Sequence, residues 1–96
     1  MATTIKENEI VIVGRGKPLL NYVTACITSF NEGRKELTLR ARGDAINSSV
    51  EVVRLLKSKF IPDLEISDAK ISSDHLKSKE GRSLNLPVLE LVLSRK

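Results

Sequence analysis

The strongest constraint on the fold is an early change of hydrophobic period, from a strand pattern to a helix pattern across a glycine-containing loop. Residues 10–13 form a short β-branched run that ends at Gly14, the pattern of a buried strand followed by a turn. Pro18 then stands where a helix begins, because its missing N–H is no loss there. Helical spacing follows at Leu20, Val23, Thr24, Ile27 and Phe30. We therefore predict a strand and then a helix, which residues 31–33 end.

The same succession recurs in the middle of the chain. Residues 36–41 alternate as a half-buried strand does, with Arg40 and Arg42 on its outer face. Gly43 breaks this strand, and Asp44 caps or leads into a second helix. The apolar stripe of that helix consists of Ile46, Val50, Val53 and Leu56, and the helix runs through to Phe60.

The pattern in the last third of the chain predicts two strands, at about residues 64–73 and 84–94. A long polar and basic tip at residues 75–82 joins them. Pro87 indicates an edge or a bulge near the start of the last strand. The order is β-α-β-α-β-β. We therefore predict an α+β fold, a two-layer α/β sandwich. Its four-stranded mixed sheet carries both helices on one face and a long β-hairpin arm. Residues 10–96 form one domain after a flexible N-terminus, residues 1–9.

Basic charge is clustered along the chain. Sixteen Lys and Arg against twelve Asp and Glu give a net charge of +4, which suits a polyanionic partner. One cluster, opposed only by Glu36, consists of Arg34, Lys35, Arg40 and Arg42. Another, opposed only by Glu80, consists of Lys77, Lys79 and Arg82. The acidic stretch between them contains Asp63, Glu65, Asp68 and Asp74.

Several function classes are disfavoured. Lys17 is followed by Pro18 rather than Ser or Thr, so the P-loop pattern fails, and Leu19 replaces the third glycine of the dinucleotide fingerprint. His75 is the lone histidine and is best interpreted as a surface residue. Cys26 lies in the first predicted helix as a small core residue, with no second cysteine for a disulfide or a metal pair. We expect no enzyme, no cofactor and no metal.

The loop at residues 14–17 retains two readings. Its permissive backbone, its cations Arg15 and Lys17 and the helix start behind it suit one or two backbone phosphates, but a solvated basic turn has the same pattern. Only three aromatic residues are present, which disfavours base stacking as the mode of binding. Phe60 fits a core position and a protein interface equally well.

The N-terminal residues 1–9 contain no apolar signal core, and the longest apolar runs fall far short of a membrane span. A single cysteine points to a reducing compartment. We therefore expect a soluble, unexported protein that contacts no membrane.

Several motifs, in order and spacing, resemble the Alba family of archaeal chromatin proteins, which has eukaryotic relatives that bind RNA. They are Gly14-Arg15-Gly16-Lys17-Pro18, Asn21-Tyr22-Val23, Asn31-Glu32-Gly33, Arg40-Ala41-Arg42-Gly43 with Ala45-Ile46, Phe60-Ile61-Pro62-Asp63, and Gly81-Arg82. The resemblance covers essentially residues 10–96. It implies the same β-α-β-α-β-β fold and a homodimer, possibly a heterodimer with a paralogue. It also implies sequence-nonspecific binding to double-stranded DNA on the chromosome in the cytoplasm, with RNA or a ribonucleoprotein as the alternative partner.

The resemblance also implies roles for individual residues. The central loop contact falls to Lys17, with Arg15, Gly16 and Asn21 nearby. The body contacts fall to Arg40 and Arg42, and the minor-groove contacts of the hairpin fall to Lys77, Lys79 and Arg82. Phe60 corresponds to a position of dimer–dimer contact along DNA, which favours the interface reading.

Two departures from the family pattern affect the loop and the strand end. Many members have consecutive lysines before the proline, whereas this chain has Gly16 between Arg15 and Lys17. Lys17 is then the possible acetylation site. A basic residue is common where Asp44 stands; a carboxylate there would repel phosphate or pair with Arg40 or Arg42, which predicts weaker binding.

Overall fold

The computed structural model describes residues 8–14 and 16–95, and the side chains of residues 10–14 and 16–95. Its elements are β1 (Asn8–Val13), α1 (Leu19–Asn31), β2 (Glu36–Arg42), α2 (Ala45–Leu55), the π-helical turn η1 (Leu56–Phe60), β3 (Leu64–Lys77) and β4 (Ser83–Arg95). This order confirms the predicted β-α-β-α-β-β succession. The first strand begins at Asn8, two residues before its predicted start.

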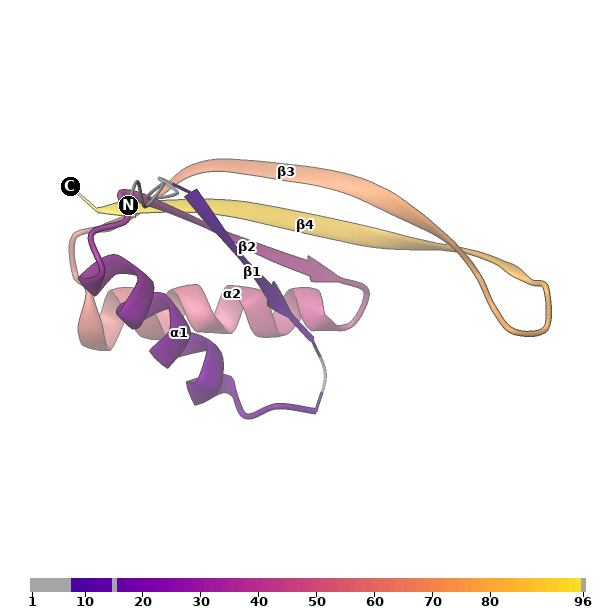
Figure 1. The fold of residues 1–96 in the computed structure, drawn as a ribbon, viewed down its shortest axis with the longest axis horizontal. Helices are drawn as coiled ribbons and strands as arrows, with labels where there is room; N and C mark the ends of the chain where they lie inside the picture. Colours follow the sequence, from indigo (N-terminus) through magenta and orange to yellow (C-terminus); the bar gives the residue numbers. More distant parts are fainter. Residues whose placement is uncertain (1–7, 15, 96) are drawn as a thin grey trace, which may run out of the picture.

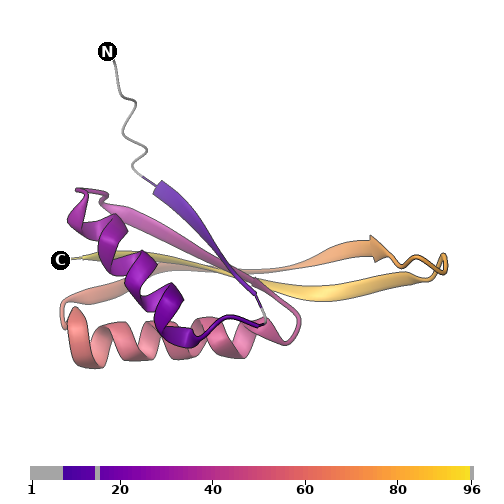
Figure 2. The same cartoon turned by 60° about the horizontal axis from the view of Figure 1, so that its bottom comes forward.

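The four strands form one mixed sheet in the order β1-β2-β4-β3. β1 pairs with β2 in parallel, and β4 pairs antiparallel with both β2 and β3. Both helices lie on the same face of the sheet, and β3 and β4 continue far beyond the other strands as an arm (Figure 1). The second view shows the same two layers and the same extended arm (Figure 2). The predicted α+β class and the single-sided helix layer are confirmed.

The core lies between the sheet and the helices. The alternation in β2 places Leu37 and Leu39 against the helices, fully buried, while Arg40 and Arg42 face away. Cys26 is also fully buried in α1, which confirms its place in the core. At about 25 cal/mol per Å² of apolar area removed from water, this layer supplies the main driving force for folding.

Three positions in the predicted helical stripes are wrong, and one of them is Thr24, which is exposed on α1. Leu20 is 61% exposed and Val50 is 47% exposed, whereas Tyr22 and Ser49 are buried. Ser49 enters the core without an unsatisfied hydroxyl because its Oγ donates to the Ile46 carbonyl oxygen at 2.7 Å. Each helix therefore buries a face rotated from the predicted stripe and leaves one large apolar side chain outside.

The second helix does not run to Phe60 as a regular α-helix. It ends at Leu55, and residues Leu56–Phe60 form the π-helical turn η1. The Ile61 N–H donates to the Leu56 carbonyl oxygen at 2.6 Å, which closes this wider turn, and Lys57 Nζ donates to the Leu64 carbonyl oxygen at 2.8 Å. The turn lets the chain reverse into β3 while Leu56 stays buried.

The hairpin differs from its predicted proportions. Strand pairing continues to Lys77 opposite Ser83, so the arm is longer and its tip shorter than residues 75–82. The register shift lies between Ile66 and Asp68 on β3, not at Pro87. Pro87 lies just beyond the last residue pair of β2 and β4, and its carbonyl oxygen accepts from the Gly43 N–H at 2.8 Å. The missing N–H of proline is tolerated there because β2 has ended. Cross-strand pairing in this polar segment outweighed the weak strand propensity of its sequence.

Candidate functional site

The loop between β1 and α1 is anchored by Tyr22. The Gly14 N–H donates to the Tyr22 hydroxyl oxygen at 3.1 Å, and the hydroxyl donates back to the Gly14 carbonyl oxygen at 3.2 Å. Gly16 has a φ of 91°, a conformation that favours glycine, and an added Cβ there would meet open space. Lys17 follows, exposed. The predicted site residue Arg15 lies outside the described residues.

The start of α1 lies directly behind this loop. Pro18 occupies the N-cap position rather than the first helical position, and its carbonyl oxygen accepts from the Asn21 N–H at 3.0 Å. Asn21 is exposed on the first turn. The first helical N–H groups thus lie beside Lys17, an arrangement that favours anions.

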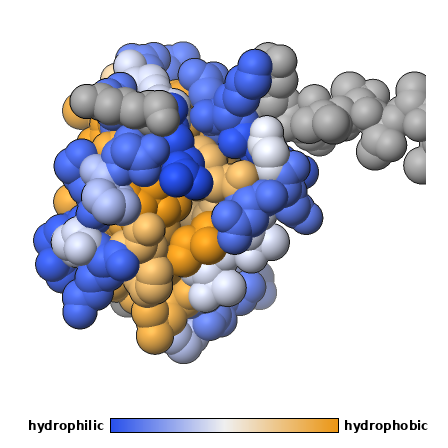
Figure 3. Space-filling view, turned by 90° about the vertical axis from the view of Figure 1, so that its left-hand side faces the viewer, coloured by the Kyte–Doolittle hydropathy of each residue, from blue (hydrophilic) through white to orange (hydrophobic). Residues whose placement is uncertain are grey.

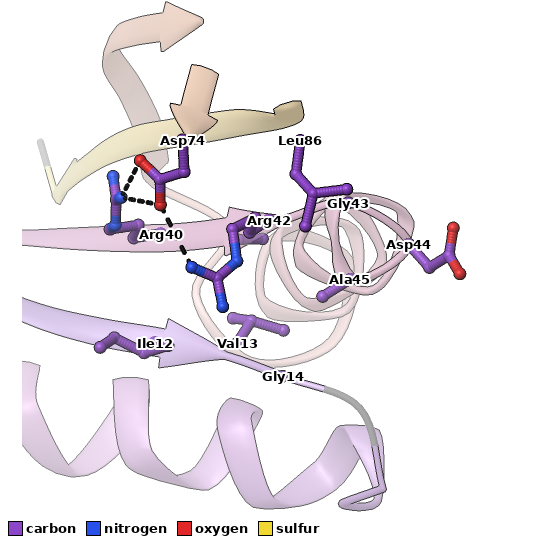
Figure 4. A pocket seen from close by; sticks show the side chains of 11 residues that line it. Ile12, Val13, Gly14, Arg40, Arg42, Gly43, Asp44, Ala45, Asp74 and Leu86 are labelled. Carbon is purple, nitrogen blue, oxygen red and sulfur yellow. Dashed lines mark hydrogen bonds and ion pairs between the residues drawn. The ribbon is translucent and has the colours of Figure 1, made fainter. Parts of the chain in front are cut away.

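Arg40 and Arg42 lie on the outer face of β2 and contact carboxylates. Asp74 approaches Arg40 Nη2 with both carboxylate oxygens, at 2.8 and 3.0 Å, and Arg42 Nη1 with one, at 3.3 Å. Glu90 contacts Arg40 Nη1 at 3.4 Å. Figure 4 shows Asp74 reaching from β3 toward both arginines, while Asp44 points away from them. The carboxylates that contact Arg40 and Arg42 are therefore those of Asp74 and Glu90, which leaves repulsion of phosphate as the expectation for Asp44.

These arginines open onto a hollow at the ends of the parallel strands. It has a volume of about 520 Å³, and its lining includes Gly14, Arg40, Arg42, Asp74 and Leu86. Gly14 also begins the loop of Lys17, so the hollow joins the loop to the base of the arm (Figure 4). Of the loop, Gly14 thus shares the lining of this hollow with the body residues Arg40 and Arg42.

The hairpin residues lie far from that surface along the arm. Lys77 is the last residue of β3, and Lys79 and Arg82 lie in the turn beyond it, all three exposed. The turn is closed by the Ser78 N–H, which donates to the Arg82 carbonyl oxygen at 2.9 Å, and by Gly81 with a φ of 81°. These three cations thus lie at the far end of the arm, whose two-stranded ribbon is seen in Figure 1.

Phe60 ends η1 and is 50% exposed. It is therefore not a core residue, which removes one of its two sequence readings. The space-filling view of this end of the molecule shows apolar surface surrounded by hydrophilic residues (Figure 3). Among the residues with described side chains, the other exposed large apolar ones are Ile10, Ile12, Leu20, Val50, Ile66, Ile71 and Leu84.

Three residues of the site escaped the sequence analysis. Asp74 and Glu90 were assigned to no site, although they are the carboxylates that Arg40 contacts. The partners lie 34 and 50 positions from Arg40 in the chain, so no local pattern connects them. Tyr22 was recognised only within a motif, and its hydroxyl contact across the loop has no signal in hydrophobic periodicity.

In residues 8–14 and 16–95, no group of three or more His, Cys, Asp or Glu residues could hold a metal ion. His75 is exposed on β3 with its Nδ1 2.7 Å from Asn85 Oδ1, as predicted for a surface residue. On α2, hydrogen bonds from Arg54 lower the pKa of the Glu51 carboxyl, and the same pair raises the pKa of Arg54. No helix within the described ranges is long and apolar enough to cross a membrane.

Comparison with known families decides the identity of the fold. Residues 7–73 match the model of the Alba family, about two thirds of the chain. The chain belongs to the Alba family. This match spans the loop, α1, β2, α2 and most of β3, so the Alba resemblance identified from the sequence motifs is confirmed.

Individual Alba proteins are similar over nearly the whole chain. "DNA/RNA-binding protein Alba" of Methanocella arvoryzae is 40% identical over 93% of this chain and 92% of its own length. "DNA/RNA-binding protein Alba 1" of Archaeoglobus fulgidus is 40% identical over 90% of this chain and 94% of its own length. The solved structure of Alba from Thermoplasma volcanium has a TM-score of 0.84 at 36% identity, covering 90% of this chain and 99% of that one. ALBA1 from Trypanosoma brucei, at 23% identity and a TM-score of 0.73 over 90% of this chain and 68% of that one, shares the fold.

Proposed function

We propose that this chain is a binding protein for double-stranded DNA that contacts the sugar–phosphate backbone and the minor groove without reading sequence. The observation that carries the proposal is the distribution of exposed cations in an Alba fold, at the β1–α1 loop, the outer face of β2 and the arm tip. The similar proteins are named as DNA/RNA-binding proteins. Lys and Arg side chains that neutralise phosphates release counterions, and this release supplies affinity without sequence preference.

The proposed mode of contact follows from the shapes of the three sites. A compact loop with exposed Lys17 suits a phosphate contact at the body of the protein. A thin ribbon that ends in Lys79 and Arg82 suits a groove, because a two-stranded ribbon is narrow enough to enter one. The scarcity of aromatic residues disfavours binding by base stacking.

We propose further that the binding unit is a dimer. After Leu64, the edge strand β3 is almost entirely exposed, including Ile66 at 53% and Ile71 at 80%. An extended edge strand with large apolar side chains promotes aggregation unless something covers it. A second copy of the chain would cover this strand, and sedimentation of the free protein should then give the mass of two chains.

Phe60 is proposed as a contact between neighbouring dimers on one DNA molecule, helping to coat or compact it. Its half-exposed ring lies at the end of η1. Burial of such a ring between dimers would favour cooperative coating.

RNA is the alternative partner, supported by the DNA/RNA-binding names of the similar proteins. The A-form helix presents phosphates and a wide minor groove to the same cations. Competition between duplex DNA and structured RNA of equal length separates the two. The DNA proposal predicts comparable or tighter binding to several unrelated duplexes, and a large preference for RNA would replace it with the alternative.

A further inference from the structure

Arg40 contacts two carboxylates, whereas Arg42 contacts one. Arg40 meets Asp74 through one terminal nitrogen and Glu90 through the other. Arg42 meets Asp74 through a single contact at 3.3 Å, and its side chain is 47% exposed against 30% for Arg40. Arg40 is thus held on two sides, whereas Arg42 keeps much of its guanidinium available to an incoming anion.

The ion-pair cluster, which consists of Arg40, Arg42, Asp74 and Glu90, spans strands that are not neighbours. Arg40 lies on β2 and Asp74 on β3, and β4 runs between them in the sheet order. Val88 of β4, opposite Arg42 in the register, is fully buried although it lies on the sheet face turned away from the helices. The cluster therefore crosses β4 at the base of the arm, beside the hollow that Gly14 also lines.

A carboxylate and a phosphate oxygen use the same donors of a guanidinium group, so only one of them satisfies a given N–H. Asp74 places one negative charge against two arginines, at the surface that joins the loop to the arm. A phosphate that approaches this surface meets a site already partly neutralised. Removal of the aspartate charge would leave the positions of the strands unchanged but would raise the local positive potential.

We propose that Asp74 is an internal competitor for the nucleic-acid backbone, which a phosphate must replace at Arg42, and that it thereby sets the affinity of the chain. This inference rests on the proposed nucleic-acid binding and adds a residue that limits it. Arg40 then acts as a positioning residue that holds Asp74 in place, and Arg42 acts as the exchangeable contact.

The test compares Asp74→Asn with the wild-type protein in anisotropy titrations on a duplex of fixed length at several salt concentrations. Asn keeps the shape of the side chain and removes its charge. The expected result is affinity higher by about three- to fivefold, the scale of one partly exposed ion pair. The salt slope should steepen by about one for each further phosphate that the variant neutralises. Asp74→Ser removes the same charge and should show the same increase, which guards against a fault specific to Asn.

Asp68→Asn is the matched control. Asp68 lies on the same strand, six residues away, and forms no ion pair among the residues that the structure describes. It loses the same charge, so any increase in affinity from net charge alone appears in both variants. An increase for Asp74→Asn no larger than that for Asp68→Asn, or a decrease in affinity, would overturn the inference.

A double-mutant cycle locates the effect. If Asp74 competes at Arg42, the increase in affinity from Asp74→Asn should largely vanish in an Arg42→Ala background. A full increase in that background would contradict the competition. If the wild-type protein binds no duplex and no RNA at low salt, the proposed function fails instead, and the failure is then distinct from a failure of the competition.

Discussion

The exposed Lys17 and the arginines of β2 differ in their surroundings. Lys17 forms no ion pair with any residue whose side chain the structure describes, whereas Arg40 and Arg42 share the carboxylate of Asp74. A free cation contributes its full charge to the approach of a phosphate. A paired cation must first exchange its partner, so equal charges at these positions contribute unequally to binding.

Lys17→Ala should therefore weaken binding by about 1 kcal/mol, the scale of one charge-assisted contact, and should reduce the salt slope. Lys17→Gln, which resembles the acetylated side chain, should behave in the same way, and Lys17→Arg should bind like the wild type. The measurement is a fluorescence anisotropy titration at three salt concentrations.

The control for Lys17 is Lys35→Ala, because Lys35 is exposed just before the opposite end of β2 and loses the same charge. Equal slopes for Lys17→Ala and the wild-type protein would remove Lys17 from the binding surface. If Lys17→Ala and Lys35→Ala weakened binding equally, Lys17 would contribute only through the net charge of the protein.

The arm places cations away from the body of the protein, at the end of an exposed two-stranded ribbon. Lys79 and Arg82 lie at its tip, held by the turn around Gly81. The double variant Lys79→Ala/Arg82→Ala should lower the salt slope by about one for each phosphate that the tip no longer neutralises, while the unfolding temperature stays unchanged. Electrophoretic mobility shifts and thermal melting check both parts.

The double variant Lys35→Ala/Lys59→Ala provides the charge-matched comparison, since both lysines are exposed and remote from the arm. An arm that binds nucleic acid predicts a clear difference between the two double variants. Indistinguishable binding curves would mean that the tip cations contribute only to overall charge.

Elements and their order were predictable because they follow from local hydrophobic period and from turn residues. The alternation of β2 correctly separated buried Leu37 and Leu39 from the outward Arg40 and Arg42. The limits of the arm were not predictable, because pairing between β3 and β4 extends both strands through polar residues that resemble a loop in sequence. The cross-sheet contact of Asp74 was equally hidden, since sequence groups Asp74 with an acidic stretch that the fold disperses.

At the scale of the whole molecule, the apolar surface left outside the core favours assembly. Phe60→Ala should loosen cooperative coating of long DNA and leave the mass of the free protein unchanged, because the half-exposed ring contributes little to the core. Binding isotherms on long and on short duplexes provide the measurement. Loss of folding, or equal cooperativity for variant and wild type, would contradict the contact between dimers.

This Alba-family protein is proposed to bind nucleic acid through phosphate contacts and to read no bases. The most direct test is the affinity of the wild-type protein for two duplexes of unrelated sequence, measured over a range of salt concentrations. Binding through phosphates alone predicts that the two affinities agree and that the logarithm of each falls steeply and linearly with the logarithm of the salt concentration. Affinity that is insensitive to salt, or confined to one of the two sequences, would contradict it.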